Sequence, residues 1–330
     1  MSDTFKALVL TQEDGKTVSN IKQLNNDDLP EGDVLLAVDY SSLNYKDGLA
    51  ITGKGKIVRQ WPLVPGIDLA GTVLESDSSD YAVGDRVVLT GWSVGEKYWG
   101  GYSQRQRVQS KWLVPLPEGL DSKQAMAIGT AGFTAMLCIM TLEEAGVTPD
   151  KGTVLVTGAS GGVGSVAVAI LAKLGYTVAA VSAKPEADDF LRGLGASEIL
   201  TREEMSEKPR PLEGQRWAGA VDVVGTTTLA RVLAEMNYGG CVAACGLAGG
   251  FDLPTTVMPF ILRNVSLRGV DSVMCPVERR KVAWQRLVTD LPAEALGEIG
   301  QVASLEQLPE LAEKITTGGV RGRVIVDLNA

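Results

Sequence analysis

The sequence predicts an α/β protein in which a doubly wound parallel sheet is inserted into a discontinuous, β-rich lobe. Two observations support this fold class. Residues 5–114 form short strand-like segments separated by turns such as Pro65-Gly66, whereas the chain after Pro117 alternates apolar strands with helices. The strands of this second part are continuous runs of Val, Leu and Ala, which indicates strands that are covered on both faces.

The elements can be placed in order along the chain. In the first lobe we expect strands at 7–10, 33–40, 71–74 and 85–90. The inserted part is expected to hold strands at 153–157, 177–182, 198–200, 220–224, 240–245 and 266–270, with helices at 162–174, 187–194 and 229–236. Helices at 278–291 and 308–316 and a strand at 323–328 should return to the first lobe. This order predicts one domain from 1–127 and 275–330 and a second from 128–274.

Length, charge and composition limit the functions that are possible. A chain of 330 residues is long enough for two domains. Its formal net charge is -9 and its basic residues are scattered, which argues against a nucleic-acid partner because affinity for phosphate backbones depends on clustered Lys and Arg. The chain contains no histidine, so every mechanism that needs an imidazole is excluded.

Two long uncharged segments, 124–142 and 152–172, have the length of membrane-spanning helices. Both are interrupted by glycines, so we expect buried elements and no membrane contact. No hydrophobic leader precedes Phe5, and the four cysteines lack the dense spacing of a disulfide framework. We therefore expect a cytoplasmic protein.

A glycine-rich turn follows the first strand of the inserted sheet. Gly158, Gly161 and Gly164 are spaced so that the chain turns tightly, its backbone approaches a pyrophosphate, and the next helix packs on the strand. Amides at a helix N-terminus bind an anion when no side chain blocks the approach. This context favours a dinucleotide site over a flexible surface loop. The predicted contacts are Gly158, Ser160, Gly161, Gly162, Val163 and Gly164.

The residues after the second strand indicate which dinucleotide binds. An acidic residue about 20 positions beyond the turn would accept from the ribose 2'-hydroxyl of NAD. This chain has Ser182, Ala183 and Lys184 there instead. Because a hydroxyl and an ammonium bind a 2'-phosphate that a carboxylate repels, we predict NADPH as the cofactor, with Arg202 as a further contact. The alternative for Lys184 is a solvated loop lysine.

Several runs resemble the medium-chain dehydrogenase/reductase superfamily. The resemblance to its zinc-free quinone-oxidoreductase branch lies in residues 41–47 (SSLNYKD), 64–71 (VPGIDLAG), 128–135 (IGTAGFTA) and 158–164 (GASGGVG). A closer resemblance, to the acrylyl-CoA reductase group, lies in residues 89–92 (LTGW), 236–247 (MNYGGCVAACGL) and 253–264 (LPTTVMPFILRN). The resemblance covers nearly the whole chain. It implies a Rossmann domain inserted into a GroES-like catalytic domain.

The resemblance also bears on metals. In zinc-dependent relatives the Pro-Gly pair is followed by a metal-binding histidine, where this chain has Ile67. The structural-zinc lobe of those relatives carries four closely spaced cysteines, whereas no cysteine here precedes Cys138. Since neither zinc site can be built, we expect no metal.

The resemblance implies hydride transfer from NADPH to the β-carbon of acrylyl-CoA, or of a similar short unsaturated thioester, and protonation at the α-carbon. Without a metal, hydrogen-bond donors must stabilise the enolate oxyanion. Tyr45 lies in the motif that lines the nicotinamide cleft in relatives, so it is the first candidate for donor and cofactor contact. Asn44 and Asp47 are candidates for orienting Tyr45 or the cofactor ribose. The alternative for Tyr45 is a half-buried packing residue, and Asp68 is equally compatible with a structural role.

Further contacts are implied by the same resemblance. At the nicotinamide end the expected contacts are Thr130, Gly246, Leu247, Ile261 and Ser272. Phosphates of coenzyme A would need cations at the mouth of the cleft, for which Arg263 and Arg323 are candidates.

Two other functions stay open. A quinone or enone reductase would use the same hydride with an uncharged acceptor, and a non-catalytic NADPH-binding protein would bind the cofactor without turnover. In each case the predicted partners are small molecules. The run 266–270 forms an apolar edge that a second subunit can extend, so we also expect a homodimer.

Overall fold

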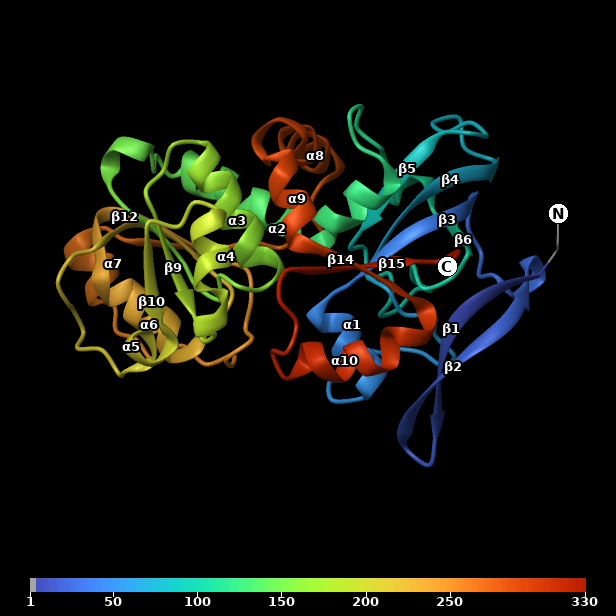
Figure 1. Ribbon diagram of the computed structural model, residues 1–330, viewed down its shortest axis with the longest axis horizontal. Helices are drawn as coiled ribbons and strands as arrows, with labels where there is room; N and C mark the ends of the chain where they lie inside the picture. Colours follow the sequence, from blue (N-terminus) through green and yellow to red (C-terminus); the bar gives the residue numbers. More distant parts are fainter. Residues whose placement is uncertain (1–3) are drawn as a thin grey trace. The chain divides into compact units, whose positions relative to one another are not determined.

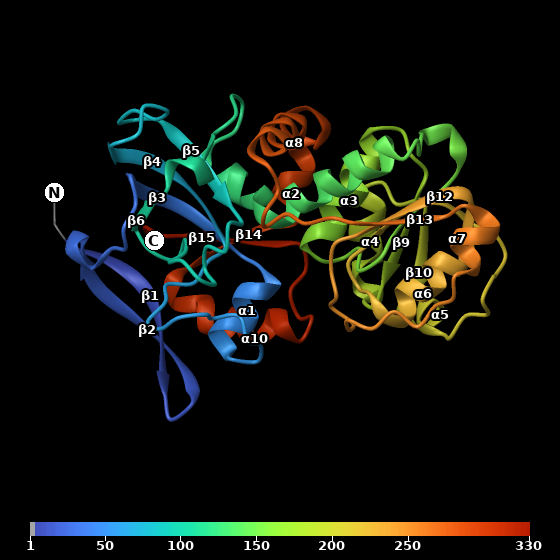
Figure 2. The ribbon, with the colours of Figure 1, turned by 180° about the vertical axis from the view of Figure 1, so that it is seen from behind.

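Two compact units make up the chain, which a computed structural model describes from residue 4 to residue 330. The first unit comprises the described residues up to Thr130 together with Ser272–Val288 and Ile299–Ala330. The second unit comprises Ala131–Asp271 and Thr289–Glu298. Figures 1 and 2 show the elements of both units as ribbons. Each unit has a hydrophobic core of its own.

The second unit is built on a parallel sheet. Its strand order within the described residues is β10-β9-β8-β11-β12-β13, and all neighbouring strands run parallel. The strands are β8 (Val154–Val156), β9 (Val178–Ser182), β10 (Glu198–Thr201), β11 (Trp217–Asp222), β12 (Met236–Ala244) and β13 (Ser266–Gly269). The chain first adds strands on one side of β8 and then on the other, so the predicted doubly wound sheet is confirmed.

Burial explains why these segments are strands. Every residue of β8, β9 and β11 is buried, as expected for continuous apolar runs that helices cover on both faces. The helices that lie between Ala131 and Asp271 in this unit are α3 (Gly162–Lys173), α4 (Asp188–Gly193), α5 (Arg202–Ser206), α6 (Thr226–Glu235) and α7 (Met258–Arg263), in addition to most of α2 (Ser122–Glu144). The predicted helix at 162–174 and strand at 177–182 differ from α3 and β9 by one residue.

The first unit holds a largely antiparallel sheet. Its order within the described residues is β14-β15-β3-β4-β5-β7, with β6 paired to β3. The strands are β3 (Val34–Leu43), β4 (Asp68–Ser76), β5 (Arg86–Thr90), β6 (Arg105–Val108), β7 (Val114–Pro115), β14 (Gly300–Ser304) and β15 (Arg323–Asp327). A separate hairpin is formed by β1 (Thr4–Glu13) and β2 (Lys16–Asn25). The last strand, β15, pairs antiparallel with β3, so the end of the chain completes the sheet of the first lobe.

A helix in the first lobe was not predicted. α1 (Tyr45–Thr52) follows β3 directly, and Gly53, with φ +68, ends it in a left-handed conformation. It lies beside α10 (Leu308–Thr316) in both ribbon views, and a Cβ at Gly48 would meet the Ile315 side chain. Two further helices are α8 (Val277–Asp290), which lies mainly in the first unit, and α9 (Ala293–Ile299), which lies mainly in the second.

The helix α2 (Ser122–Glu144) contains a kink at Gly129, where φ is +52 and the backbone is not helical. Among the described residues it is the one helix with the length and hydropathy to cross a membrane. Its most apolar window is entirely buried within the protein, as in the core helix of a globular domain.

Candidate functional site

The carboxyl ends of β8 and β11 lie next to each other where the strand order of the parallel sheet reverses. Ligands of doubly wound sheets bind at this point. Thr157, directly after β8, donates its hydroxyl hydrogen to Oδ1 of Asp222 at 2.7 Å. The Gly225 amide donates to Oδ2 of the same carboxylate at 2.8 Å. Burial raises the pKa of Asp222, and both donors oppose this by favouring the ionised form.

The glycine-rich turn between β8 and α3 leaves the first amides of the helix accessible. Gly158 has φ +58, a conformation that favours glycine. A Cβ at Gly164 would collide with Gly158 and Ala159, so α3 packs directly on the turn. A Cβ at Gly161, by contrast, would have the Gly158 carbonyl oxygen at 3.3 Å as its only neighbour within 4 Å. A side chain there would require the Gly158 carbonyl to give by a few tenths of an ångström, and it would stand at the start of α3.

Ser182 connects the glycine turn to the residues after β9. Its hydroxyl donates to Oγ of Ser160 at 3.4 Å and accepts from the Lys184 amide at 3.1 Å. Thr201, the last residue of β10, pairs with Ser182, the last residue of β9. Arg202, which follows Thr201, therefore lies at the same end of the sheet as Ser182. The structure therefore brings the residues predicted to bind a 2'-phosphate to adjacent positions.

Gly246 and Leu247 follow β12 at the same edge. A Cβ at Gly246 would meet the Val223 carbonyl oxygen at 2.5 Å, and one at Gly158 would meet the Val223 side chain at 2.5 Å. The loops after three neighbouring strands are thus packed closely together. The side chains of Leu247 and of Ile261 on α7 are 63% and 72% exposed, so both are open to solvent.

A polar cluster of five residues is buried in the first unit next to the start of α1. It consists of Ser42, Asn44, Asp68, Thr130 and Arg323. Both carboxylate oxygens of Asp68 accept from the Ser42 hydroxyl at 2.8 Å, and Oδ2 also accepts from Asn44 Nδ2 at 3.0 Å and the Thr130 amide at 2.8 Å. Arg323 donates to Ser42 Oγ at 2.6 Å and to Asn44 Oδ1 at 3.1 Å. The cluster therefore ties β3, β4 and β15 to the kink of α2.

Asp47 is fully buried next to this polar cluster. Its two carboxylate oxygens accept from the amides of Asn44 at 2.9 Å and Ile67 at 3.0 Å. Burial, and secondly the negative charge of Asp68, raise the pKa of Asp47 to about 7. Asn44 is the N-cap of α1 and Asp47 lies in its first turn, and the bond between them holds the backbone that carries Tyr45.

Tyr45 is the first residue of α1, and its side chain is 42% exposed. The structure thus places a phenol at the surface on an anchored backbone. Ser272 is half-buried and lies at the point where the chain re-enters the first unit. Tyr45, Asn44, Asp47, Thr130 and Ser272 all belong to the first unit, and the predicted glycine-turn and phosphate contacts belong to the second.

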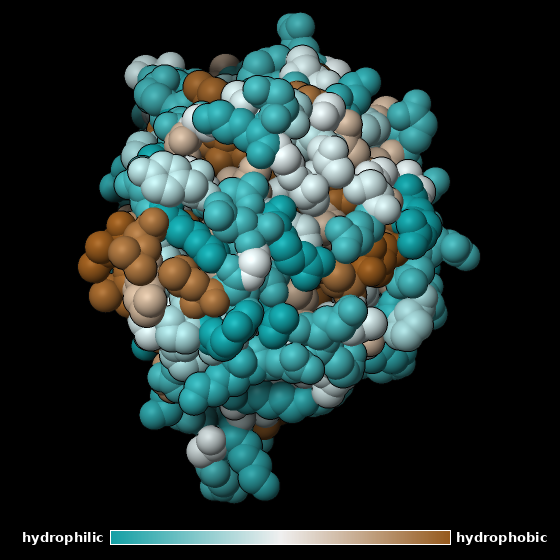
Figure 3. All heavy atoms as spheres, turned by 90° about the vertical axis from the view of Figure 1, so that its left-hand side faces the viewer, coloured by the Kyte–Doolittle hydropathy of each residue, from teal (hydrophilic) through white to brown (hydrophobic). Residues whose placement is uncertain are grey.

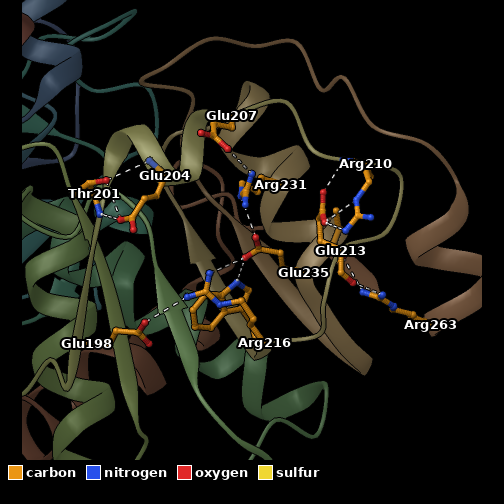
Figure 4. A network of polar contacts seen from close by, with 12 residues as sticks. Glu198, Thr201, Glu204, Glu207, Arg210, Glu213, Arg216, Arg231, Glu235 and Arg263 are labelled. Carbon is orange, nitrogen blue, oxygen red and sulfur yellow. Dashed lines mark hydrogen bonds and ion pairs between the residues drawn. The ribbon is translucent and has the colours of Figure 1, made fainter.

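The two arginines predicted as coenzyme A contacts have other partners. Arg323 is 2% exposed, and its Nε donates to the Ala127 carbonyl at 3.1 Å. Arg263 donates to the backbone carbonyl of Glu213 (Figure 4). It also donates to the carbonyls of Ala234 and Met236 at 2.8 and 3.2 Å. Met236 begins β12, so this contact lies at the amino end of the strand, opposite to the edge that binds ligands. We therefore withdraw both residues as phosphate contacts.

The ion-pair network around Arg263 has a structural role. Glu235, which is buried, accepts from Trp217 Nε1 at 2.9 Å and pairs with Arg231 and Arg216 at 3.0 and 3.6 Å (Figure 4). Trp217 is the first residue of β11, so the network also lies at the amino ends of the strands. The buried Glu235 carboxylate is thus paired with two guanidinium groups, and removal of a partner would leave its charge less compensated.

Three residues of the candidate site were not identified from the sequence: Ser42, Thr157 and Asp222. Thr157 and Asp222 each stand at the end of an apolar strand beside a glycine loop, and that position is a usable signal. Ser42 offers none, because its partner Arg323 is 281 positions away.

Within residues 4–330, no group of three or more His, Cys, Asp or Glu side chains is placed to hold a metal ion. Ile67 is 6% exposed and offers no ligand atom in its side chain.

Two known protein families match the chain. Residues 30–118 match the alcohol dehydrogenase GroES-like domain, and residues 162–289 match the zinc-binding dehydrogenase family. An acrylyl-CoA reductase, AcuI of Ruegeria pomeroyi, is 58% identical over 329 residues, which cover 99% of this chain and 100% of the relative. The chain belongs to the acrylyl-CoA reductase family. Its fold is that of the medium-chain dehydrogenase/reductases, a GroES-like domain with a Rossmann domain.

Two further relatives of the family show how far the likeness extends. The putative quinone oxidoreductase YhfP of Bacillus subtilis is 47% identical, with 99% of this chain and 100% of the relative covered. The crystal structure of Escherichia coli YhdH with bound NADPH matches with a TM-score of 0.96 at 59% identity, over 98% of this chain and 100% of that one.

Proposed function

We propose that this protein reduces the carbon-carbon double bond of acrylyl-CoA, or of a similar short α,β-unsaturated thioester, with NADPH and without a metal. The observation that carries this proposal is the near-full-length identity of 58% to an acrylyl-CoA reductase. The open glycine turn at the reversal point of the parallel sheet supports it independently, because this is where a dinucleotide binds. In this proposal the first unit is the catalytic domain and the second is the NADPH-binding domain.

The residues of the second unit fit NADPH. The turn presents free helix amides to a pyrophosphate, and glycine at position 161 keeps the space in front of them open. Ser182, Lys184 and Arg202 offer one hydroxyl and two cations for the 2'-phosphate, where an acidic residue would repel it. When bound, the cofactor supplies the hydride that reaches the β-carbon.

The residues of the first unit bind and orient the acceptor. Tyr45 donates a hydrogen bond to the thioester oxygen as negative charge develops on it, which is the task a metal would otherwise have. Asn44 and Asp47 hold the Tyr45 backbone through the polar cluster and the first turn of α1. Thr130 and Ser272 are our proposed contacts of the first unit for the nicotinamide end of the cofactor. The proposed contacts of the second unit, taken by itself, are Gly246, Leu247 and Ile261.

A quinone or enone reductase is the second candidate function. It is favoured by one observation, the 47% identity to a putative quinone oxidoreductase. It also requires no phosphate-binding cations for the acceptor, and the two arginines predicted for that purpose are bound to protein carbonyls and hydroxyls. A non-catalytic NADPH-binding protein is the third, and the exposed Tyr45 argues against it.

The decisive experiment follows NADPH oxidation at 340 nm with acrylyl-CoA, crotonyl-CoA and 1,4-benzoquinone in parallel. We expect the highest kcat/KM with acrylyl-CoA. Higher kcat/KM with the quinone would replace the proposal by the second function, and binding of NADPH without turnover of any acceptor would replace it by the third.

We also propose that the protein is a cytoplasmic homodimer. β13 is one of the two edge strands of the parallel sheet among the described residues, so its outer side can pair with the same strand of a second copy. Brown, apolar side chains stand out from a mainly teal face of the molecule in Figure 3. The exposed apolar residues of the second unit lie mostly in one segment, with Leu247, Phe251, Leu253, Val257, Met258, Ile261 and Leu262. Sedimentation equilibrium should give twice the mass of one chain, and a single-chain mass would refute the dimer.

A further inference from the structure

Arg280 on α8 binds the segment through which the chain re-enters the first unit. The side chain is 1% exposed. Its Nη2 donates to the carbonyls of Ser272 at 2.9 Å and Val273 at 2.7 Å, and its Nε donates to the Cys275 carbonyl at 2.8 Å. Three carbonyls within four residues thus converge on one guanidinium.

The remaining donors of Arg280 bind the end of β5. Nη1 donates to the Thr90 carbonyl at 2.7 Å and to the Thr90 hydroxyl at 2.9 Å. A guanidinium has five N–H donors in a rigid planar arrangement, and Arg280 directs all of them at backbone or hydroxyl oxygens. The side chain therefore fastens residues 272–275 to β5, and a lysine cannot reproduce this geometry.

The turn after β5 is shaped to receive the same segment. Gly91 has φ +79, and a Cβ there would lie 2.7 Å from the Val273 carbonyl oxygen. Trp92 has φ +55, donates its amide hydrogen to the Val273 carbonyl at 2.9 Å, and lies with its ring 4.8 Å from the Arg280 guanidinium. A non-glycine residue in this conformation is costly, and it persists only where its surroundings determine it strongly.

Hydrogen bonds connect this turn to the start of α1. The Gly91 amide donates to the Ile67 carbonyl at 3.1 Å. The Ile67 amide in turn donates to Asp47, whose carboxylate holds the first turn of α1. The segment at Ser272 and the helix that carries Tyr45 are thus attached to the same rigid part of the first unit.

We infer that Arg280 is a positioning residue that sets the place of residues 272–275, and through them of the nicotinamide end of the cofactor, relative to Tyr45. The inference rests on the proposed function, in which Ser272 contacts the cofactor. Arg280 acts through the segment and not on a ligand, because its donors are directed at protein oxygens and its side chain is buried.

The test compares Arg280→Met and Arg280→Lys with the control Arg263→Met. Both arginines donate to backbone carbonyls, but those of Arg263 lie at the amino ends of strands, away from the candidate site. The readouts are the Kd of NADPH from its fluorescence, hydrogen exchange of the peptides that contain residues 90–93 and 272–276, and the deuterium isotope effect with NADPH labelled at nicotinamide C4.

We expect Arg280→Met to raise the Kd of NADPH at least fivefold, to speed exchange in both peptides, and to enlarge the isotope effect because hydride transfer becomes slower than the other steps. Arg280→Lys should be intermediate. A purely structural role would lower the folded fraction, and so kcat, with KM, Kd and the isotope effect unchanged, as we expect for Arg263→Met. If the Arg280 variants share that pattern, the inference is wrong.

This outcome is separable from failure of the proposed function. The Kd and exchange measurements need no acceptor, so they remain decisive if the wild-type protein fails to reduce acrylyl-CoA. If Arg280→Met does not fold, the same readouts on Arg280→Lys decide, and wild-type values for that variant would also refute the inference.

Discussion

The hydroxyl of Thr157 donates to the carboxylate of Asp222 at 2.7 Å, and this bond joins the two strands on either side of the point where the parallel sheet reverses its order. The carboxylate also accepts from the Gly225 amide. The buried Asp222 carboxylate therefore holds the starts of both loops that border the proposed dinucleotide site. The glycine turn is accordingly held in place before any ligand arrives, and its substitutions can be expected to act on binding.

Gly161→Ala should separate binding from folding. The added Cβ meets no atom of the protein closer than 3.3 Å, so the melting temperature should change little. It stands in front of the first amides of α3, so the Kd of NADPH should rise about tenfold or more, the loss of one charge-assisted hydrogen bond. Gly164→Ala is the comparison, because its Cβ collides with the turn and should lower both stability and binding. Unchanged NADPH binding in Gly161→Ala would argue against this turn as the cofactor site.

Lys184→Ala should weaken binding of NADPH but not of NADH. The ammonium is proposed to bind the 2'-phosphate that NADH lacks, and a charge-assisted bond of this kind contributes about 1.5 to 3 kcal/mol, or roughly tenfold to 100-fold in Kd. Arg202→Ala should act in the same direction. The measurement is the ratio of the two Kd values in wild type and variants. Equal binding of NADH and NADPH by the wild type would contradict the assignment of the residues after β9.

How much of this could be predicted depended on sequence distance. The strands of the parallel sheet were predictable because β8 and β9 are continuous apolar runs, and the site at their carboxyl ends follows from the order of the elements. The helix α1 was not predicted, because it has eight residues and includes Gly48, although Asn44 at its N-cap and Asp47 in its first turn form a capping box. The partners of Arg323 could not be predicted, because Asn44 is 279 positions away along the chain.

Tyr45→Phe should lower kcat with acrylyl-CoA about 100-fold, the usual effect of removing one donor to a developing oxyanion. The KM for NADPH and the melting temperature should stay close to wild type, because the phenol is 42% exposed and the backbone is held by other residues. Tyr238→Phe, on a tyrosine that is 73% exposed in the second unit, is the matched control. A kcat within threefold of wild type would leave Tyr45 as a packing residue.

The pKa of Asp47, raised from 3.8 to about 7, predicts a pH dependence of stability. Because the folded state binds this proton more tightly, the group contributes most stability below the unfolded pKa, and the contribution is lost as the pH rises through 7. The melting temperature of Asp47→Asn minus that of wild type should therefore increase between pH 5 and pH 9. Asp33→Asn is the control, since the pKa of Asp33 is lowered and both of its states are ionised over that range. A constant difference for Asp47→Asn would show that the carboxylate is charged throughout.

The kink at Gly129 restricts how this polypeptide can diverge. Its φ of +52 disfavours any residue with a Cβ, and that atom would fall among the Arg323, Ser42 and Asp68 side chains. A larger residue at position 129 is thus acceptable only if two or three of the residues Ser42, Asp68 and Arg323, which are distant in the sequence, are replaced as well. Single mutational steps at any of the four sites begin with a penalty, so we expect these residues to be inherited as a set.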